Sequence, residues 1–415
     1  MGMTVIEKIL ARASGAASVM PGDLAVVDVD LVVMIDLSFS QGSWREVLKV
    51  HDPEKVVVVF DHDVPASNRD SAAMHVRGRE FARHFGIGRV HDVGPDQGIS
   101  HVVVAENAYA LPGTVMACSD SHTCSAGALN CAARGLGAPD LLHALTTGKT
   151  WFRVGETVRY DLDGRLMPGV AAKDLFLWIA GTHGDHANQN VEFGGPALPH
   201  LSIDARRTLT TMGAELSAEF CTFEPDPVLI DYVKARNPAP FEPQYPDPDA
   251  VYADRRPIDL AALQPMVALP DAVIRNTVPV TEAAGVPIQQ AFIGSCANGT
   301  LDDIAAAAGV LQGRRVAEGV RLLVTPGSQK IAAAAARAGY TQTLLEAGAV
   351  VTPATCGACY GGHMGVLGPA ETCITASTRN FRGRMGHETA RIYMASAATV
   401  AASAVRGRIA DARSL

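Results

Sequence analysis

The sequence predicts an α/β protein made of three subdomains. Short apolar runs rich in valine alternate with alanine-rich stretches and glycine-bearing loops, which is the pattern of strands alternating with helices. The 415 residues exceed the size at which a single hydrophobic core stops growing, so two or three packed units are expected. With 48% hydrophobic, 19% charged and 6% aromatic residues, the composition is typical of a globular enzyme rather than a disordered or fibrous chain.

The first subdomain is expected to span residues 1–156. Four apolar β-branched runs are interpreted as its strands, at 24–36, 55–63, 99–106 and 113–122. Each run leads into a polar loop or a helical stretch, and chemistry is expected where the strands end.

The second subdomain is expected at 157–265 and the third at 266–415. The tract 237–257 is dense in Pro and Asp, so it is predicted to be an extended surface segment of the second. In the third, QQAFIG and VRLLV are predicted strands, whereas LDDIAAAAGVLQG, KIAAAAARAGY and the alanines from 395 to 404 are predicted helices.

Charge and targeting signals exclude several classes of protein. The net charge of −8 argues against a polyanion as the main partner. The apolar run from Leu24 to Leu37 is interrupted by Asp28, Asp30 and Asp36, so it is predicted to be neither a signal peptide nor a membrane span. Eight cysteines in a chain of this length favour reduced thiols for metal binding or catalysis, and the cytoplasm is the expected compartment.

Three cysteines form the strongest local signal. Cys296 follows a predicted strand in GSCANG, and Cys356 and Cys359 stand in TCGACYGG. A Cys-x-x-Cys pair alone also serves zinc sites and redox pairs. Three thiolates without a fourth favour an iron-sulfur cluster whose open iron acts as a Lewis acid.

The other cysteines are not predicted ligands. Cys118, Cys131 and Cys221 stand in apolar stretches and are interpreted as small core residues. Cys124 and Cys373 lie beside motifs, and their role stays open.

Histidines and aspartates recur at predicted strand ends. They are Asp61 and His62 in VFDHDVPA, His101 in GISHVVVAE, and Asp120 and His122 in CSDSHTC. One such histidine is more often a structural residue, but several beside carboxylates suit proton transfer to and from a leaving hydroxyl.

The segment STRNFRGRMGHE carries three arginines. A guanidinium fork at Arg379 or Arg384 suits a substrate carboxylate. Arg382 is interpreted as a solvated loop residue.

The chain resembles the aconitase superfamily, and within it the isopropylmalate isomerase branch. The resemblance extends over roughly residues 20 to 405 and rests on the ordered motifs DHDVPA, GISH, SDSHT, FIGSCANG, VTPGSQ, CGACYGGHMG and TRNFRGRMG. It implies an aconitase-like core of three α/β subdomains around a central iron-sulfur site. The implied activity is a hydro-lyase that dehydrates or isomerises a small hydroxy-dicarboxylic acid of the substituted-malate type, nominally 3-isopropylmalate.

The resemblance also implies roles for individual residues. Cys296, Cys356 and Cys359 match the three ligands of a 4Fe-4S cluster. The implied acid–base pairs are Asp61 with His62, Asp120 with His101, and Glu215 with His122. The implied substrate-binding residues are Ser121, Arg379 and Arg384.

A partner chain is implied as well. In such enzymes the proton-abstracting base is a serine on a swivelling domain, and this sequence stops at RGRIADARSL. A separate small subunit is therefore expected to supply that domain, and the chain alone should be inactive.

Several positions depart from the family pattern. Ile35 stands where His or Gln is usual, Thr211 and Thr378 each replace an Asn, and the loop after Cys296 reads Asn298-Gly299-Thr300 where a Ser followed by a larger residue is common. These changes bear on the surroundings of the cluster and on substrate choice. Citramalate, dimethylmalate or a specialised malate analogue is therefore an alternative substrate, and a cluster-free RNA-binding regulator or an inactive subunit is an alternative function.

Overall fold

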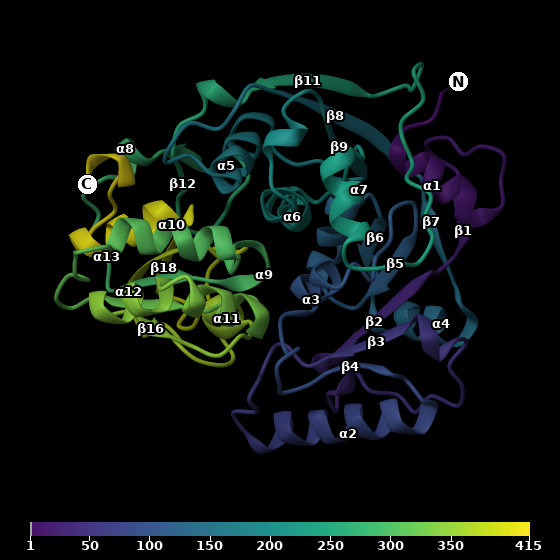
Figure 1. Ribbon diagram of the computed structural model, residues 1–415, viewed down its shortest axis with the longest axis horizontal. Coiled ribbons are helices and arrows are strands. Elements are labelled where there is room, and N and C mark those ends of the chain that lie inside the picture. The colour runs from purple at the N-terminus through teal and green to yellow at the C-terminus, as the bar shows by residue number, and fades with distance from the viewer. Residues whose placement is uncertain (1) are drawn as a thin grey trace.

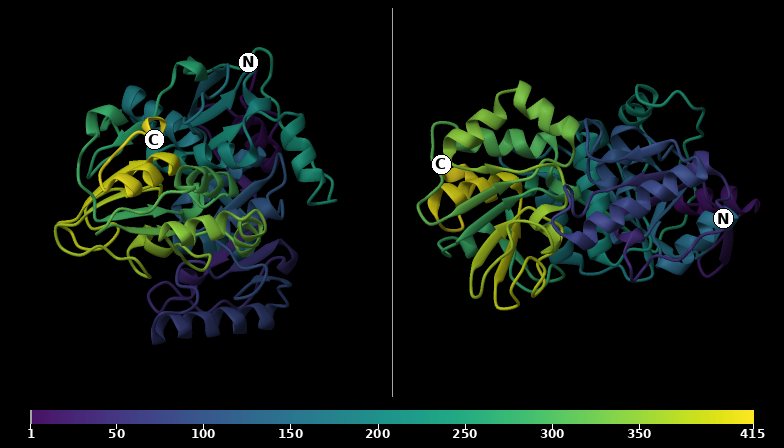
Figure 2. Two further views of the ribbon diagram at one scale, coloured as in Figure 1. Left: turned by 60° about the vertical axis from the view of Figure 1, so that its left-hand side comes forward. Right: turned by 90° about the horizontal axis from the view of Figure 1, so that it is seen from below.

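The computed structural model describes residues 2–415. Its main sheets come from successive stretches of the chain, and Figure 1 shows the short helices α3, α6 and α9 in the space between them. The views in Figure 2 show the C-terminal part, coloured green to yellow, packed beside the purple and blue N-terminal part. No helix within residues 2–415 is both long and apolar enough to cross a membrane.

The first large sheet has five parallel strands in the order β4-β3-β2-β5-β6. The strands are β2 (Leu31–Ile35), β3 (Val56–Val59), β4 (Arg89–His91), β5 (Val115–Cys118) and β6 (Ala132–Gly135). Side chains alternate between the two faces of a strand, so Val32 and Met34 pack with α2 (Arg69–Phe85) and α4 (Ala138–Thr147). The opposite face packs against α3 (Ser100–Glu106).

The run 99–106 was predicted to be a strand, and this prediction is wrong. Its residues form α3, whose Val103 and Val104 pack on the sheet. Valine lowers helix propensity only slightly, and burial against a sheet overrides that preference. The run 24–36 is likewise two strands, of which β1 (Leu24–Asp28) pairs with β7 (Lys149–Arg153) beside α1 (Val5–Ser14).

The second sheet has four parallel strands in the order β10-β9-β8-β11. They are β8 (Glu156–Asp163), β9 (Gln189–Gly194), β10 (Cys221–Phe223) and β11 (Asp254–Asp259). The helices α5 (Ala172–His183) and α6 (Ile203–Thr211) contribute to its core. Between α7 (Pro227–Lys234) and β11, residues 235–253 contain no helix.

The third sheet has seven strands in the order β13-β12-β18-β17-β14-β15-β16. They are β12 (Met266–Ala268), β13 (Thr277–Pro279), β14 (Gln290–Ile293), β15 (Arg321–Val324), β16 (Val350–Val351), β17 (Thr372–Thr375) and β18 (Arg391–Ala395). Its helices are α8 (Val280–Ala283), α9 (Ser295–Asn298), α10 (Leu301–Leu311), α11 (Gln329–Arg337), α12 (Tyr340–Ala347) and α13 (Ala397–Arg406). We propose 1–156, 157–265 and 266–415 as the three subdomains.

A buried ion pair joins α6 to the start of α7. Arg206 donates two hydrogen bonds of 2.7 Å to the two carboxylate oxygens of Asp226. We expect Asp226→Ala to lower the free energy of unfolding by ~3–5 kcal/mol, because it leaves an uncompensated buried charge. Asp28→Ala, which removes the exposed partner of Lys149, should cost at most ~1 kcal/mol. Denaturant unfolding measures both, and equal losses would contradict the prediction.

Candidate active site

Three carboxylates follow adjacent strands of the first sheet. Asp36 comes directly after β2, and Asp61 and Asp120 come two residues after β3 and β5. Because β3, β2 and β5 are parallel neighbours, their carboxyl ends meet at one edge of the sheet, where α/β proteins usually bind ligands. All three aspartates therefore converge, although 84 residues separate the first from the last.

His62 lies between two of these carboxylates. Its Nδ1 lies 2.8 Å from Oδ1 of Asp61 and 3.1 Å from Oδ1 of Asp36. Burial opposes a charged imidazole, but the attraction of Asp61 and the hydrogen bond with Asp36 raise the pKa of His62 well above its ordinary value. The two carboxylates therefore favour the charged imidazole, the form that can donate a proton.

Asp120 connects the other two histidines. Its Oδ1 accepts from Nε2 of His101 at 2.8 Å and from the backbone N–H of His122 at 2.7 Å. Nε2 of His122 lies 3.0 Å from Oε1 of Glu215. Burial disfavours the carboxylate, yet the hydrogen bonds from His101 and His122 hold the pKa of Asp120 well below its ordinary value. Burial likewise opposes the charged form of His122, but Asp120 and Glu215 raise its pKa.

The cysteine loop contacts the first sheet directly. The backbone N–H of Cys356 donates to the carbonyl of Asp61 at 2.9 Å, and Thr355 donates to the same oxygen at 2.9 Å. Cys359 lies 3.6 Å, sulfur to oxygen, from the hydroxyl of Thr378. The third cysteine, Cys296, enters from α9 after β14 and is buried.

One cavity brings these groups together. It has about 350 Å³ of space not filled by atoms, including the part open to solvent. Its lining comprises Asp61, His62, Ile99, His101, Asp120, His122, Ser295, Cys296, Cys356, Cys359, Tyr360, Thr378 and Arg384. All three predicted thiol ligands and five of the six predicted catalytic residues thus face the same space.

The donor set fits an iron-sulfur cluster better than a zinc ion. Burial, followed by nearby anionic groups that include the other thiols, raises the pKa of Cys296 and Cys356. Three sulfurs that line one cavity can together hold a metal centre, and metal binding would release their protons. Asp61, His62 and Cys356 also offer ligand atoms within 4.8 Å of one another. However, this group includes only one of the three cavity thiols, so a zinc ion bound there would leave Cys296 and Cys359 without a role.

The arginine segment is only partly at the cavity. Arg384 lines it and donates from Nη2 to Sγ of Cys359 at 3.8 Å. Its Nε is buried and has no hydrogen-bond partner within residues 2–415. Arg379 lies outside the lining and donates to Glu215 at 2.7 Å and to Ser121 at 2.9 Å. Glu215 and Ser121 are therefore linked to the cavity through His122 and Arg379 rather than exposed in it.

Reasoning from the sequence did not single out two residues of the site. Asp36 binds the ring and the backbone of His62, and Tyr360 lines the cavity with its ring edge-on to His62. The position of Asp36 at a strand end was an available signal. For Tyr360, the neighbouring Cys359 was the only hint.

The departures from the family pattern have different surroundings. Thr378 lies in the cavity against Cys359. Thr211 is fully buried and lies 2.9 Å, oxygen to oxygen, from Ser125. Ile35 is buried and lines a separate apolar pocket that borders Asp120, with about 770 Å³ of space not filled by atoms.

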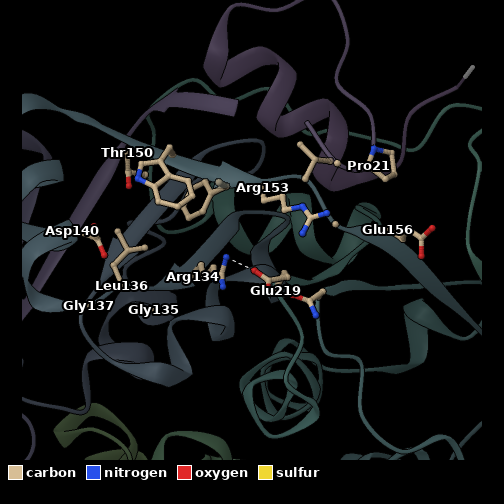
Figure 3. A pocket seen from close by; sticks show the side chains of 16 residues that line it. Pro21, Arg134, Gly135, Leu136, Gly137, Asp140, Thr150, Arg153, Glu156 and Glu219 are labelled. Atoms are coloured by element: carbon tan, nitrogen blue, oxygen red, sulfur yellow. Dashed lines mark ion pairs between the residues drawn. The ribbon is translucent and has the colours of Figure 1, made fainter. Parts of the chain in front are cut away.

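A larger cavity, of about 1580 Å³ by the same measure, lies away from these groups, beside β7 (Figure 3). Figure 3 shows Arg134 and Glu219 paired across it. Among the described residues, its lining contains neither histidine nor cysteine. Cavity size alone therefore does not identify the active site, because the smaller cavity contains the histidines, carboxylates and thiols suited to catalysis.

The comparisons with known proteins agree with this geometry. The aconitase family model (aconitate hydratase) matches residues 18–407, and the chain belongs to the aconitase family. It is 54% identical over 413 residues to the 3-isopropylmalate dehydratase large subunit of Mycolicibacterium smegmatis, covering 100% of this chain and 97% of the relative. It is 42% identical over 421 residues to the probable 3-isopropylmalate dehydratase large subunit of Methanothermobacter thermautotrophicus, covering 100% of both chains.

A solved structure supports the fold. The holo-form of Thermococcus kodakaraensis aconitase X superposes with a TM-score of 0.50 at 14% identity, covering 93% of this chain and 91% of that chain. The predicted family membership and the predicted α/β aconitase-like fold are thus confirmed.

Proposed function

We propose that this chain is the large subunit of a 3-isopropylmalate dehydratase, an iron-sulfur hydro-lyase. One observation carries the proposal: three thiols, two complete histidine–carboxylate pairs, a third histidine and one arginine line a single cavity. The identity to named large subunits over the whole chain supports the substrate.

The cofactor in this proposal is a 4Fe-4S cluster held by Cys296, Cys356 and Cys359. When bound, such a cluster supplies an open iron position that acts as a Lewis acid on a substrate hydroxyl. Burial opposes the thiolate of Cys359, but the guanidinium of Arg384 and the hydroxyl of Thr378 lower its pKa. These two groups therefore favour the charged form of this ligand.

The histidine–carboxylate pairs move the proton that the leaving hydroxyl needs. Asp61 holds His62, Asp120 holds His101, and Glu215 holds His122, each at 2.8–3.0 Å. Each carboxylate orients its imidazole and stabilises the charged ring. Protonation of the departing oxygen by one of these rings lets it leave as water, and the reverse transfer activates water for rehydration.

Arginines bind the substrate carboxylates. Arg384 lines the cavity, and its Nε has no hydrogen-bond partner within residues 2–415. We therefore assign this arginine to one carboxylate, because a guanidinium fork binds such a group with two hydrogen bonds. Arg379 and Ser121 lie outside the cavity lining and are joined by a hydrogen bond; we assign them to a second carboxylate that would extend beyond the cavity, with Glu215 fixing the orientation of this arginine.

A small subunit completes the enzyme. The names of the relatives describe them as large subunits, and we propose that the partner supplies a swivelling domain with the catalytic serine. All eight cysteines are free thiols, which supports the cytoplasm as the compartment.

The test is a reconstitution. The chain is loaded anaerobically with iron and sulfide and assayed with and without a candidate small subunit, following formation of the unsaturated acid from 3-isopropylmalate. We expect turnover only with both subunits, and turnover by the chain alone would contradict the requirement for a small subunit. Preferential turnover of citramalate or dimethylmalate would identify that acid as the substrate in place of 3-isopropylmalate. Activity on citrate alone would contradict the proposed function.

A further inference from the structure

A lysine on α5 is buried without a counter-ion. Lys173 is fully buried, and its Nζ donates to the carbonyl of Ser377 at 3.0 Å. Its other close neighbours are the sulfurs of Met212 at 3.3 Å and Met394 at 3.9 Å. Within residues 2–415, no carboxylate is hydrogen-bonded to it, and Asp303 and Glu215 act on it only through space. Burying an ammonium group that has only one carbonyl acceptor lowers the free energy of unfolding. The presence of a lysine here therefore needs a physical explanation.

Two of the groups that act electrostatically on Lys173 are thiols that line the proposed cluster site. Burial lowers the pKa of Lys173 to about 8, whereas Asp303, Cys296, Cys359 and Glu215 raise it, in that order. Two of these four groups are predicted cluster ligands. The contact with Ser377 also fixes the loop that carries Thr378, the neighbour of Cys359.

A second buried cation contacts the other ligand loop. Arg207 on α6 is 1% exposed and donates from Nη2 to the carbonyl of Cys296 at 2.9 Å. Its Nη1 pairs with Asp204 at 2.8 Å. Neither Lys173 nor Arg207 lines the cavity, so both lie behind its wall, away from the space for substrate.

We propose that Lys173, assisted by Arg207, is a positioning residue that offsets the negative charge of the cysteine-held cluster from behind the cavity. This inference rests on the proposed function. Three thiolates bring three negative charges into a buried site, and the potential of an iron-sulfur cluster depends on net charge and surroundings. A fixed positive charge nearby favours the reduced state and helps to retain the cluster.

The test uses two neutral variants and one control. Lys173→Met keeps the length of the side chain, while Lys173→Gln keeps a donor for the carbonyl of Ser377. The control Arg206→Met removes a fully buried cation on α6 that is paired with Asp226 instead. Each chain is reconstituted anaerobically, and its midpoint potential is measured by EPR-monitored redox titration.

Both Lys173 variants should have a more negative midpoint potential than the parent. The expected shift is about 59 mV, which corresponds to a change of about tenfold in the equilibrium constant for a one-electron reduction. Arg206→Met should leave the midpoint unchanged. Unchanged midpoints in both Lys173 variants, with the cluster bound, would overturn the inference while leaving the proposed function intact. A parent chain that binds no cluster would overturn both.

Unfolding of the cluster-free chain gives an independent measurement. Without the cluster, the charge of Lys173 is uncompensated, so Lys173→Met should raise the denaturant midpoint at pH 7. The folded-state pKa lies below the ordinary value of 10.5, so the penalty is full below pH 8 and disappears as the pH rises to 10.5. The gain should therefore vanish at high pH. A lower midpoint at both pH values would indicate a purely structural lysine.

Discussion

Replacing Cys356 by alanine is expected to abolish cluster binding and, with it, all hydro-lyase activity. Cys356 is the least buried of the three cavity thiols, and its backbone position is fixed by the carbonyl of Asp61. Two remaining cysteines leave the cluster with too few protein ligands. Iron and sulfide analysis, visible absorption and EPR should show about four irons per chain in the parent and a near-complete loss in the variant.

The matched control is Cys373→Ala. Cys373 is buried in β17 but lies outside the cavity lining, so this variant should retain the cluster. It should lower the free energy of unfolding by only ~1 kcal/mol, as a small truncation in the core does. Equal iron content in Cys356→Ala and the parent would remove Cys356 from the ligand set, and zinc in place of iron would reject the cluster.

The cysteine motifs and the strand-end aspartates could be predicted because their signal is local. Cys296 follows β14 within three residues, and Asp61 follows β3 within two. A chain that ends a buried strand must turn there, and polar residues at such a turn project beyond the sheet edge. The sequence therefore predicted which side chains carry chemistry. It could not predict their mutual distances, because these depend on the order of strands in the sheet.

The error at α3 has a tertiary cause. Three successive valines favour a strand, but the backbone N–H of Ser100 donates to Oδ2 of Asp61 at 2.8 Å. Such a contact satisfies a free donor at the helix N-terminus. The acceptor is 39 residues away, so no capping pattern is visible in the local sequence.

Lys173 shows a further limit of sequence reasoning. On a helix, a lysine is usually solvent-exposed, and AAKDLFLW contains no sign that this one is buried. Its burial follows from the packing of α5 against the loop at Ser377, which lies 204 residues later. Asp36 is a similar case, because its role depends on β2 and β3 being neighbours.

The second large effect is expected from Asp120→Asn. The amide keeps the shape of the side chain but removes the charge that holds His101 at 2.8 Å and lies 3.8 Å from Nε2 of His62. Loss of one general acid–base group costs ~10²–10⁴-fold in rate, and we expect kcat to fall within that range. The cysteines are untouched, so the absorption and EPR spectra of the cluster should persist.

The pH profile distinguishes this role from a structural one. Asp120 and Glu215 raise the pKa of His122 against the effect of burial, so Asp120→Asn should lower it. If His122 acts as an acid, activity is lost as the pH rises through its pKa, and the alkaline limb of the profile should move to lower pH in the variant. The control Asp140→Asn, at an exposed position in the first turn of α4, should change neither kcat nor the profile. A variant that lost its cluster, or kept the parent profile at reduced kcat, would show that Asp120 supports the fold of the site rather than proton transfer.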